Sequence, residues 1–414
     1  MLETIPDLLL ACLCATPPEY LAARLSQISP TSWDQLVALA TTQQVGPLLY
    51  HRLKAQGYAP AIPAVAWQNL QKIYYANAAR NMRIYQELSK LTEALHAQTI
   101  PVLVLKGAHL AASVYETLAL RTMLDIDLLV HQTDLLAVIE QIQTLGYQPI
   151  TPMPSLDALL AHRHHLPPFV HPQAVAAIEI HWTITLPNQS YTIPMDELWA
   201  RSTPVTLHNI ATRGLCPEDL LLHICMHATY HHWLQQGVRF LADIAEIVHV
   251  YGEQLDWESV IARASAWKWQ KGTFLALAAA QQLLGAKLPQ QVLEQADLVM
   301  PIKFALGDLQ PLLFPAHPDL LNSPSGYFLN FLNNPSLLAK IRLFAQRLFL
   351  SPEEMSVKYG LAPQSAGRYL YYPARLSHLL SSFAHQAWQM WLGEPVLKDV
   401  ASKQARLQRW LEHA

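Results

Sequence analysis

The spacing of apolar residues in the first part of the chain predicts helices. Between residues 32 and 57, apolar side chains recur every three or four positions, which is the period of one face of an α-helix. A longer stretch with the same period spans residues 65–98, where Asn77 and Asn81 interrupt the apolar stripe with polar groups. We therefore expect a helical region over residues 1–98. The two asparagines leave open whether its last helix is continuous.

Apolar runs of strand length appear after residue 100 and alternate with helical stretches. Strands are expected at residues 101–107, 123–130, 147–150 and 175–184, and helices at residues 107–117 and 133–145. An order of strand, helix, strand, helix and a further strand is typical of a small α/β unit. The sequence therefore predicts an α/β core over residues 99–205.

Helical periodicity returns at about residue 216 and continues toward the C-terminus. Pro217, followed at once by two acids, is a favourable helix start. Prolines and asparagines punctuate residues 301–334, which is typical of a linker or long loop, and helices resume at residue 335. The predicted fold class is α+β and mostly helical, with a small α/β core flanked by helical N- and C-terminal regions. The expected regions are 1–98, 99–205, 206–300 and 301–414.

Composition narrows the class of protein. Of the 414 residues, 51% are hydrophobic and 14% are charged, which suits a folded globule and argues against disorder. The formal net charge of −3 gives no basic field for a large nucleic-acid footprint. The four cysteines form no C-x-x-C pair, so reduced thiols are expected. The N-terminus lacks a basic segment, and no apolar run approaches the roughly 18 residues of a membrane span. The expected location is the cytoplasm, without a transmembrane segment.

Two acids in one expected strand form the most specific chemical signal. Residues two apart in a strand point to the same face, so Asp125 and Asp127 present their carboxylates side by side. Alone, such a pair also fits acids that face solvent or cap a turn. A divalent cation between the carboxylates removes their repulsion, and Mg²⁺ binds carboxylates together with phosphate oxygens. We expect the two acids to be exposed and to repel each other, so that they add no stability without a bound cation. Glu179, flanked by isoleucines in a later strand, is a candidate for a second metal position or for taking the proton of an acceptor hydroxyl.

The segment before the acid pair has the residues to hold phosphate groups. Lys106 and Gly107 stand where an expected strand ends and an expected helix begins. Glycine lets the backbone approach a phosphate, a helix N-terminus offers free N–H groups, and lysine adds a point charge. Arg121, four residues before Asp125, either contacts a phosphate or pairs with an acid. The sequence leaves both roles open.

These residues resemble a known family. The stretch LVLKGAHLAASVYETLALRTMLDIDLLV, followed by LGYQP and IEIHW, is similar to the poorly characterised nucleotidyltransferase family of the polymerase-beta-like superfamily. The later segments PEDLLLHICMHA and RFLADIAEIV resemble the helical half of that family. The resemblance covers about residues 30–250 and is strongest at residues 102–130. Ala108 stands where the wider superfamily has Gly or Ser, and Lys106 can substitute for the missing serine hydroxyl.

The resemblance implies an activity and a set of roles. A nucleoside monophosphate would move from a nucleoside triphosphate to an acceptor, with Mg²⁺ or Mn²⁺ as the cofactor. The catalytic and metal-binding residues would be Asp125, Asp127 and Glu179, and the nucleotide-binding residues Lys106, Gly107 and Arg121. The acceptor is not readable from the sequence, and the near-neutral charge favours a protein or small molecule over a nucleic acid. The alternative is a non-catalytic nucleotide- or partner-binding protein that retains the fold.

Two groups of histidines are candidates of lower specificity. His223, His227 and His231 recur every four residues on an expected helix, with His232 beside them. Without the acid of an H-E-x-x-H motif, they are expected to be core or interface residues rather than a catalytic metal site. A second group crowds a proline-rich segment near Glu179, where one member could contact substrate and a surface loop is the simpler interpretation. Its members are His162, His164, His165 and His171.

The remaining polar and apolar signals have simple expected roles. Asp243 is expected to pair with Arg239, four residues earlier on the same helix. Asp196 and Glu197 are the next candidates should Glu179 not be the third acid. An apolar stripe at residues 378–395 predicts a core helix, and a protein partner bound through the C-terminal helices is the alternative.

Overall fold

The structure is a computed structural model. It describes residues 4–187, 193–234, 237–299, 309–314 and 337–350, with shorter stretches between residues 355 and 411. The chain divides into two compact units. The first comprises Met1–Ile150, Arg163–His232 and Gln236–Leu306, and the second comprises Thr151–His162, Trp233–Gln235 and Gly307–Ala414. The candidate chemistry lies in the first unit.

Helices form the N-terminal part of the first unit. They are α1 (Ile5–Leu13), α2 (Leu21–Leu25), α3 (Pro30–Thr42), α4 (Gly46–Ala55), the 3₁₀ turn η1 (Ala59–Ala61) and α5 (Ala64–Ala97). The helical stretch expected from residue 32 divides into α3 and α4, because Gln44 adopts a left-handed conformation with a φ of 58°. Thr4 caps α1 through a capping box with Asp7.

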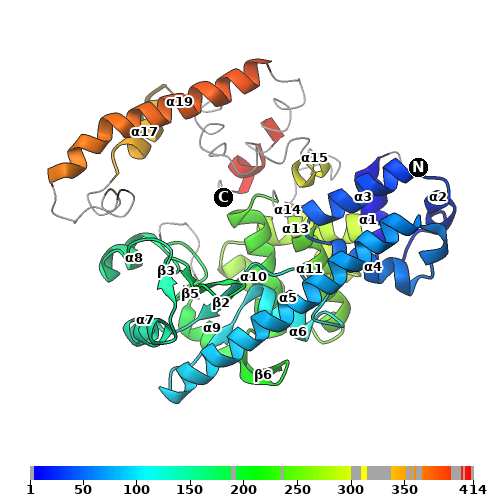
Figure 1. Cartoon of the computed structure of the whole chain (residues 1–414), viewed down its shortest axis with the longest axis horizontal. Coiled ribbons are helices and arrows are strands. Elements are labelled where there is room, and N and C mark those ends of the chain that lie inside the picture. The colour runs from blue at the N-terminus through cyan, green and yellow to red at the C-terminus, as the bar shows by residue number, and fades with distance from the viewer. Residues whose placement is uncertain are drawn as a thin grey trace. The chain divides into compact units, whose positions relative to one another are not determined.

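Helix α5 is continuous over 34 residues (Figure 1). Asn77 and Asn81, which interrupt its apolar stripe, are 8% and 0% exposed. The Asn77 amide donates to the carbonyl of Ala119 at 2.7 Å, and the Asn81 amide donates to that of Arg121 at 2.7 Å. The two asparagines therefore bind the turn that leads into the strand carrying the acid pair.

The sheet of the first unit has seven strands in the order β3-β4-β5-β2-β1-β7-β6. The strands are β1 (Leu103–Val104), β2 (Asp125–Leu129), β3 (Gln148–Pro149), β4 (Phe169–Val170), β5 (Ala177–His181), β6 (Thr203–Leu207) and β7 (Ile210–Gly214). Strand β2 lies centrally, antiparallel to β1 and parallel to β5. Its Ile126 and Leu128 are buried, as their alternation with the acids predicts.

All four expected strands are present, although each is shorter than its apolar run. Strand β4 and the β6–β7 hairpin were not expected from the sequence. The hairpin turns at His208 and Asn209, whose φ angles are 47° and 71°, and β7 pairs in parallel with β1. The predicted fold class, α+β and mostly helical with a small α/β core, is confirmed.

The remaining helices of the first unit frame the sheet and form a bundle. They are α6 (Lys106–Ser113), η2 (Gln132–Asp134), α7 (Leu135–Thr144), α9 (Met195–Arg201), α10 (Pro217–Met226), α11 (Arg239–Tyr251), α12 (Trp257–Ala266), α13 (Gln270–Leu284) and α14 (Gln290–Val299). A π-helical turn at His227–His231 continues α10. Helix α13 packs against α10 and α11 with a nearly uninterrupted run of buried residues. All four cysteines are free, as expected.

The second unit contains α8 (Leu156–His162), α15 (Gln310–Leu313), α17 (Leu337–Leu348), η6 (Ala366–Leu370) and α19 (Tyr371–Leu392). Helices α17 and α19 contact each other, and Arg375 Nε donates to the carbonyl of Leu348 at 3.0 Å. Most of the loop expected at residues 301–334 lies outside the described residues, as do the side chains of Phe383, Trp388 and Trp391. In the described part of the chain, no helix combines the length and hydropathy needed to cross a membrane.

Candidate active site

The pairing of β2 with β5 brings the candidate acids together. In their parallel register, Asp127 lies opposite Glu179, and Asp125 lies opposite Ala177. Residues opposite each other in a parallel pair, and those two apart along a strand, share a face. Asp125, Asp127 and Glu179 therefore occupy one face of the sheet. His181, two residues beyond Glu179, belongs to the same face.

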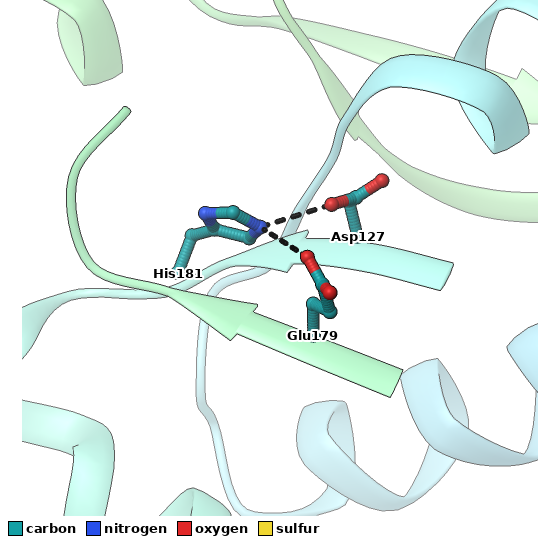
Figure 2. A group of neighbouring side chains, drawn as sticks. All are labelled: Asp127, Glu179 and His181. Carbon is teal, nitrogen blue, oxygen red and sulfur yellow. Dashed lines mark hydrogen bonds and ion pairs between the residues drawn. The ribbon is translucent and has the colours of Figure 1, made fainter. Parts of the chain in front are cut away.

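Asp127 is the centre of the polar contacts in this group. It is 2% exposed, and its Oδ1 atom accepts a hydrogen bond of 2.7 Å from Lys106 Nζ. His181 Nε2 lies 2.9 Å from the same oxygen and 3.6 Å from Glu179 Oε2 (Figure 2). Asp127, Glu179 and His181 can each offer one ligand atom, and these atoms lie within 4.8 Å of one another. This group can bind a metal ion.

The environment sets the pKa values of the two strand acids in opposite directions. Burial raises the pKa of Asp127, but the Lys106 ammonium and the hydrogen bond from His181 outweigh it and hold the pKa well below its usual range. For Asp125, burial and the neighbouring charge of Asp127 raise the pKa to about 6. Asp127 is therefore firmly charged, whereas Asp125 ionises against the field of its neighbour.

Glu179 and Lys106 are held in their charged forms by the same contacts. Burial raises the pKa of Glu179, but the hydrogen bond from His181 makes the net shift downward. Burial lowers the pKa of Lys106, but the Asp127 carboxylate reverses this effect and raises it. The site thus contains a charged lysine paired with Asp127, beside carboxylates that repel one another.

Lys106 and Gly107 lie where β1 gives way to α6, as the sequence predicts. Lys106 has a φ of 44°, a left-handed conformation that is uncommon for a residue with a side chain. A Cβ atom on Gly107 would lie 3.2 Å from the Met123 side chain and 3.5 Å from Arg121 Nη1. The lack of a side chain at Gly107 therefore lets the segment before β2 pack closely on α6.

Of the two roles that the sequence leaves open for Arg121, the structure shows pairing with an acid. Arg121 is 4% exposed, and its Nε and Nη2 atoms both donate to the Asp243 carboxylate at 2.8 Å. Tyr115 also donates to Asp243, at 2.7 Å. The expected pair between Asp243 and Arg239 is therefore wrong, because the carboxylate instead meets an arginine more than a hundred residues away in sequence. Arg239 Nη1 donates to Gln44.

The structure gathers the two histidine groups beside the acids, which the sequence did not predict. The ring of His181 lies 5.1 Å from that of His165 and 5.5 Å from that of His164, between centroids. His164 in turn lies 5.4 Å from His231, in the π-helical turn. His223 is 1% exposed, so the expectation of a core histidine is confirmed there. The histidines His164, His165, His181, His223, His227, His231 and His232 are referred to below as the histidine cluster.

Most histidines of the cluster are held in the neutral form. Burial, followed by the nearby His181, lowers the pKa of His164 to about 2. Burial and the Lys106 ammonium lower the pKa of His231 to about 4. His223 and His227 shift in the same direction, again first because of burial and then because of Lys106. The members of the cluster with lowered pKa values are therefore uncharged imidazoles at neutral pH.

The reserve candidates for the third acid have other surroundings. Asp196 and Glu197 are exposed in the first turn of α9, where Glu197 pairs with Arg201 at 3.2 Å. His171 contacts the ring of Tyr147. The residue that sequence reasoning missed is His181. Its position two residues after Glu179 in the motif IEIHW is a signal that could have found it, by the rule already applied to Asp125 and Asp127.

Comparison with known proteins gives this geometry a context. A family described as uncharacterised nucleotidyltransferase matches residues 29–285, well over half of the chain. A comparison with curated proteins finds no match. The matched region contains the asparagine-bearing helix α5, both acid-bearing strands, the Arg121–Asp243 pair and the π-helical turn. The chain therefore belongs to the uncharacterised nucleotidyltransferase family.

Proposed function

We propose that the protein transfers a nucleoside monophosphate from a nucleoside triphosphate to an acceptor, in a Mg²⁺- or Mn²⁺-dependent reaction. The observation that carries the proposal is the shared face of β2 and β5, where Asp127 lies opposite Glu179 and two residues from Asp125. Membership of the family supports nucleotidyl transfer in general. Three carboxylates on adjacent strands also suit the metal-binding site of the polymerase-beta-like superfamily, to which we assign the chain.

The proposed reaction forms one bond and breaks another at the α-phosphorus. An oxygen of the acceptor attacks this atom, and the bond to the leaving pyrophosphate breaks. Glu179 takes the proton of an acceptor hydroxyl or completes a second metal position. Asp125 and Asp127 hold the metal that accompanies the triphosphate, and this ion supplies charge neutralisation to the phosphates when bound.

Lys106 and Gly107 serve the nucleotide side of the site in this proposal. The Lys106 ammonium, now on Asp127, lies at the start of α6 and is free to turn toward a phosphate once a cation neutralises the acid. The backbone N–H groups of the first turn of α6 would add donors. Arg121 positions the segment before β2 and does not contact the phosphates, because its guanidinium is bound to Asp243.

Binding and transfer are tested with one set of reagents. Calorimetry should detect triphosphate binding in the presence of Mg²⁺ and none in excess EDTA. Incubation with α-³²P-labelled triphosphates and candidate acceptors should then move label to a protein or small molecule, with release of pyrophosphate. Equal binding with and without chelator would contradict the proposal. Labelling of RNA would redirect it toward a nucleic-acid acceptor.

A second candidate function is nucleotide binding without catalysis, and one observation favours it. The Lys106 ammonium donates to Asp127 Oδ1, and His181 Nε2 lies 2.9 Å from the same oxygen, so contacts within the chain give this acid a structural role that needs no catalysis. Such a protein would bind a triphosphate, or a partner through its C-terminal helices. Metal-dependent binding with no transfer of label to any acceptor would support this function over the first.

A further inference from the structure

We propose that Asp127, Glu179 and His181 form a site for one first-row transition-metal ion, of the Mn²⁺ to Zn²⁺ series, which is filled before any nucleotide arrives. This inference rests on the proposed function and deepens it, because Asp127 and Glu179 belong to both sites. It adds a ligand, His181, and an ion that is bound without nucleotide and is separate from the Mg²⁺ or Mn²⁺ that accompanies a triphosphate.

The spacing of the three ligand atoms fits a single small ion. His181 Nε2 lies 2.9 Å from Asp127 Oδ1 and 3.6 Å from Glu179 Oε2. An ion with bonds of about 2.0–2.2 Å separates neighbouring ligand atoms by about 2.9–3.5 Å at octahedral or tetrahedral angles. The two measured separations lie close to this interval, so a bound ion requires only small side-chain adjustments (Figure 2).

The backbone holds these side chains in place before an ion binds. Asp127 and Glu179 are opposite each other in the β2–β5 register, and His181 ends the same strand as Glu179. The Asp127 and His181 side chains are 2% and 1% exposed. Their rotamers are therefore fixed by packing, so the side chains lose little conformational entropy when an ion binds.

The mixed ligand set selects the class of ion. Mg²⁺ prefers carboxylates, phosphates and water, and it loses water reluctantly. An imidazole ligand instead suits the later first-row ions, whose affinity rises from Mn²⁺ to Cu²⁺ and is lower again for Zn²⁺. Two carboxylates balance the double charge of such an ion, while His181 contributes a neutral nitrogen. His164 and His165 lie beside His181 and bring no carboxylate that would compete for the ion.

Lys106 has a defined place in this proposal. Its ammonium shares Asp127 Oδ1 with His181, so an arriving ion competes with it for the same oxygen. Displacing a buried lysine charge from its acid opposes ion binding. The displaced side chain is then available to the phosphates of the nucleotide.

The test uses the full chain, stripped with chelator and titrated with MnCl₂, ZnCl₂ or MgCl₂ without nucleotide. One Mn²⁺ or Zn²⁺ per chain is expected, with Zn²⁺ bound at least about 100-fold more tightly than Mg²⁺. Electron spin-echo spectroscopy of the Mn²⁺ form should show coupling to a directly bound imidazole nitrogen. Absence of that coupling in the wild-type protein would overturn the proposal, whatever the variants do.

Matched variants separate this site from the proposed nucleotide site. His181→Ala should weaken Zn²⁺ binding by about 100-fold or more, since even outer-shell partners of a metal are worth 10–100-fold. His96→Ala, at an exposed histidine near the end of α5, should leave it unchanged. Asp125→Asn should keep the resident ion and lose binding of Mg–triphosphate. Unchanged Zn²⁺ affinity in folded His181→Ala would refute the inference. A wild-type chain that binds Zn²⁺ through His181 but binds no triphosphate would refute only the proposed function.

Discussion

Asp125 and Asp127 are neighbours on one strand, yet they have opposite effects on the folded state. Asp127 is buried and paired with Lys106 and His181, which corrects the expectation that both acids are exposed and contribute no stability. Removing its charge would leave a buried lysine without its carboxylate, which is strongly destabilising. Asp125 instead ionises beside an existing negative charge. The two acids therefore cannot be treated as equivalent in mutagenesis.

Asp125→Asn should stabilise the metal-free protein at neutral pH. In the folded protein the pKa of Asp125 is about 6, above its ordinary value of 3.8. Its stabilising contribution is present in full only below the unfolded pKa and is lost as the pH rises through 6. At pH 7–8 the ionised carboxylate therefore costs about 3 kcal/mol, which the amide removes. Urea unfolding in EDTA should show this gain at pH 8 and its disappearance near pH 4. Asp127→Asn, the comparison variant, should lower stability at pH 8.

Glu179→Gln decides between an enzyme and a binding protein. Because Asp125 and Asp127 would still hold the nucleotide's metal, affinity for Mg–triphosphate should change little. Turnover should fall by roughly 100-fold or more, the usual scale for losing a general base or a metal position. Calorimetry and transfer of the labelled nucleotide measure the two quantities separately. Full activity in the variant would move the third acid elsewhere, with Asp196 and Glu197 as the next positions to test.

The sequence predicts those parts of the candidate site that depend on the alternation of side chains along a single strand. Alternation along a strand predicts a common face for Asp125 and Asp127, and the same rule, applied to IEIHW, would have predicted His181. The rule could not show that Lys106 pairs with Asp127, because this contact depends on where the first residue of α6 lies relative to β2. Nor could it join His164 and His231, which lie in a loop and a π-helical turn far apart in sequence.

At the scale of elements, α5 shows how a polar interruption of an apolar stripe becomes a structural anchor. Periodicity predicted the position of this helix well, within one residue at each end. It did not show that Asn77 and Asn81 bind the turn before β2, since hydrogen bonds between distant segments leave no periodic signal. The β6–β7 hairpin escaped prediction for a related reason. Its strands alternate apolar and polar residues weakly, and Pro204 interrupts the pattern.

Asn81→Ala should disturb the site without touching it. The change removes the donor to the carbonyl of Leu118 and the shorter of two amide contacts to that of Arg121, which also accepts from Asn77 at 3.4 Å. We expect a loss of about 1–3 kcal/mol of stability and weaker binding of Mg–triphosphate, because the turn also positions β2. Chemical denaturation and calorimetry measure the two effects. Gln86→Ala, at an exposed position of the same helix, is the control and should match the wild type. A stable variant with normal binding would show that the turn is held by other contacts.

At the scale of the whole first unit, one ion pair connects the sheet-containing core to the helical bundle. Arg121 precedes β2, whereas its partner Asp243 lies in α11, and both side chains are buried. A charged group left without its partner in such an environment is much more costly than the pair itself is favourable. The pair therefore favours one arrangement of core and bundle over others.

A double-mutant cycle should reveal this connection. Arg121→Met and Asp243→Leu should each lower stability by about 3–5 kcal/mol, and the double variant should be more stable than their sum predicts. Unfolding free energies of the four proteins supply the coupling term. Additive losses would mean that the two side chains act independently. The neighbouring Tyr115→Phe change should cost less, because it removes only one neutral donor to the carboxylate.

The parallel pairing of β2 with β5 has a consequence for synthesis. Asp127 and Glu179 are about 50 residues apart in sequence, and parallel strands cannot be joined by a tight turn. On the ribosome, β2 can pair with β1 soon after both emerge, whereas its other edge stays unpaired until β5 has been synthesised. During that interval the chain carries an acid pair without Glu179 or His181 and an unpaired strand edge. The β1–β2 pair can therefore form during synthesis before the ion site is complete. Chains truncated before residue 179 should fold their N-terminal helices but bind no transition-metal ion at Asp127.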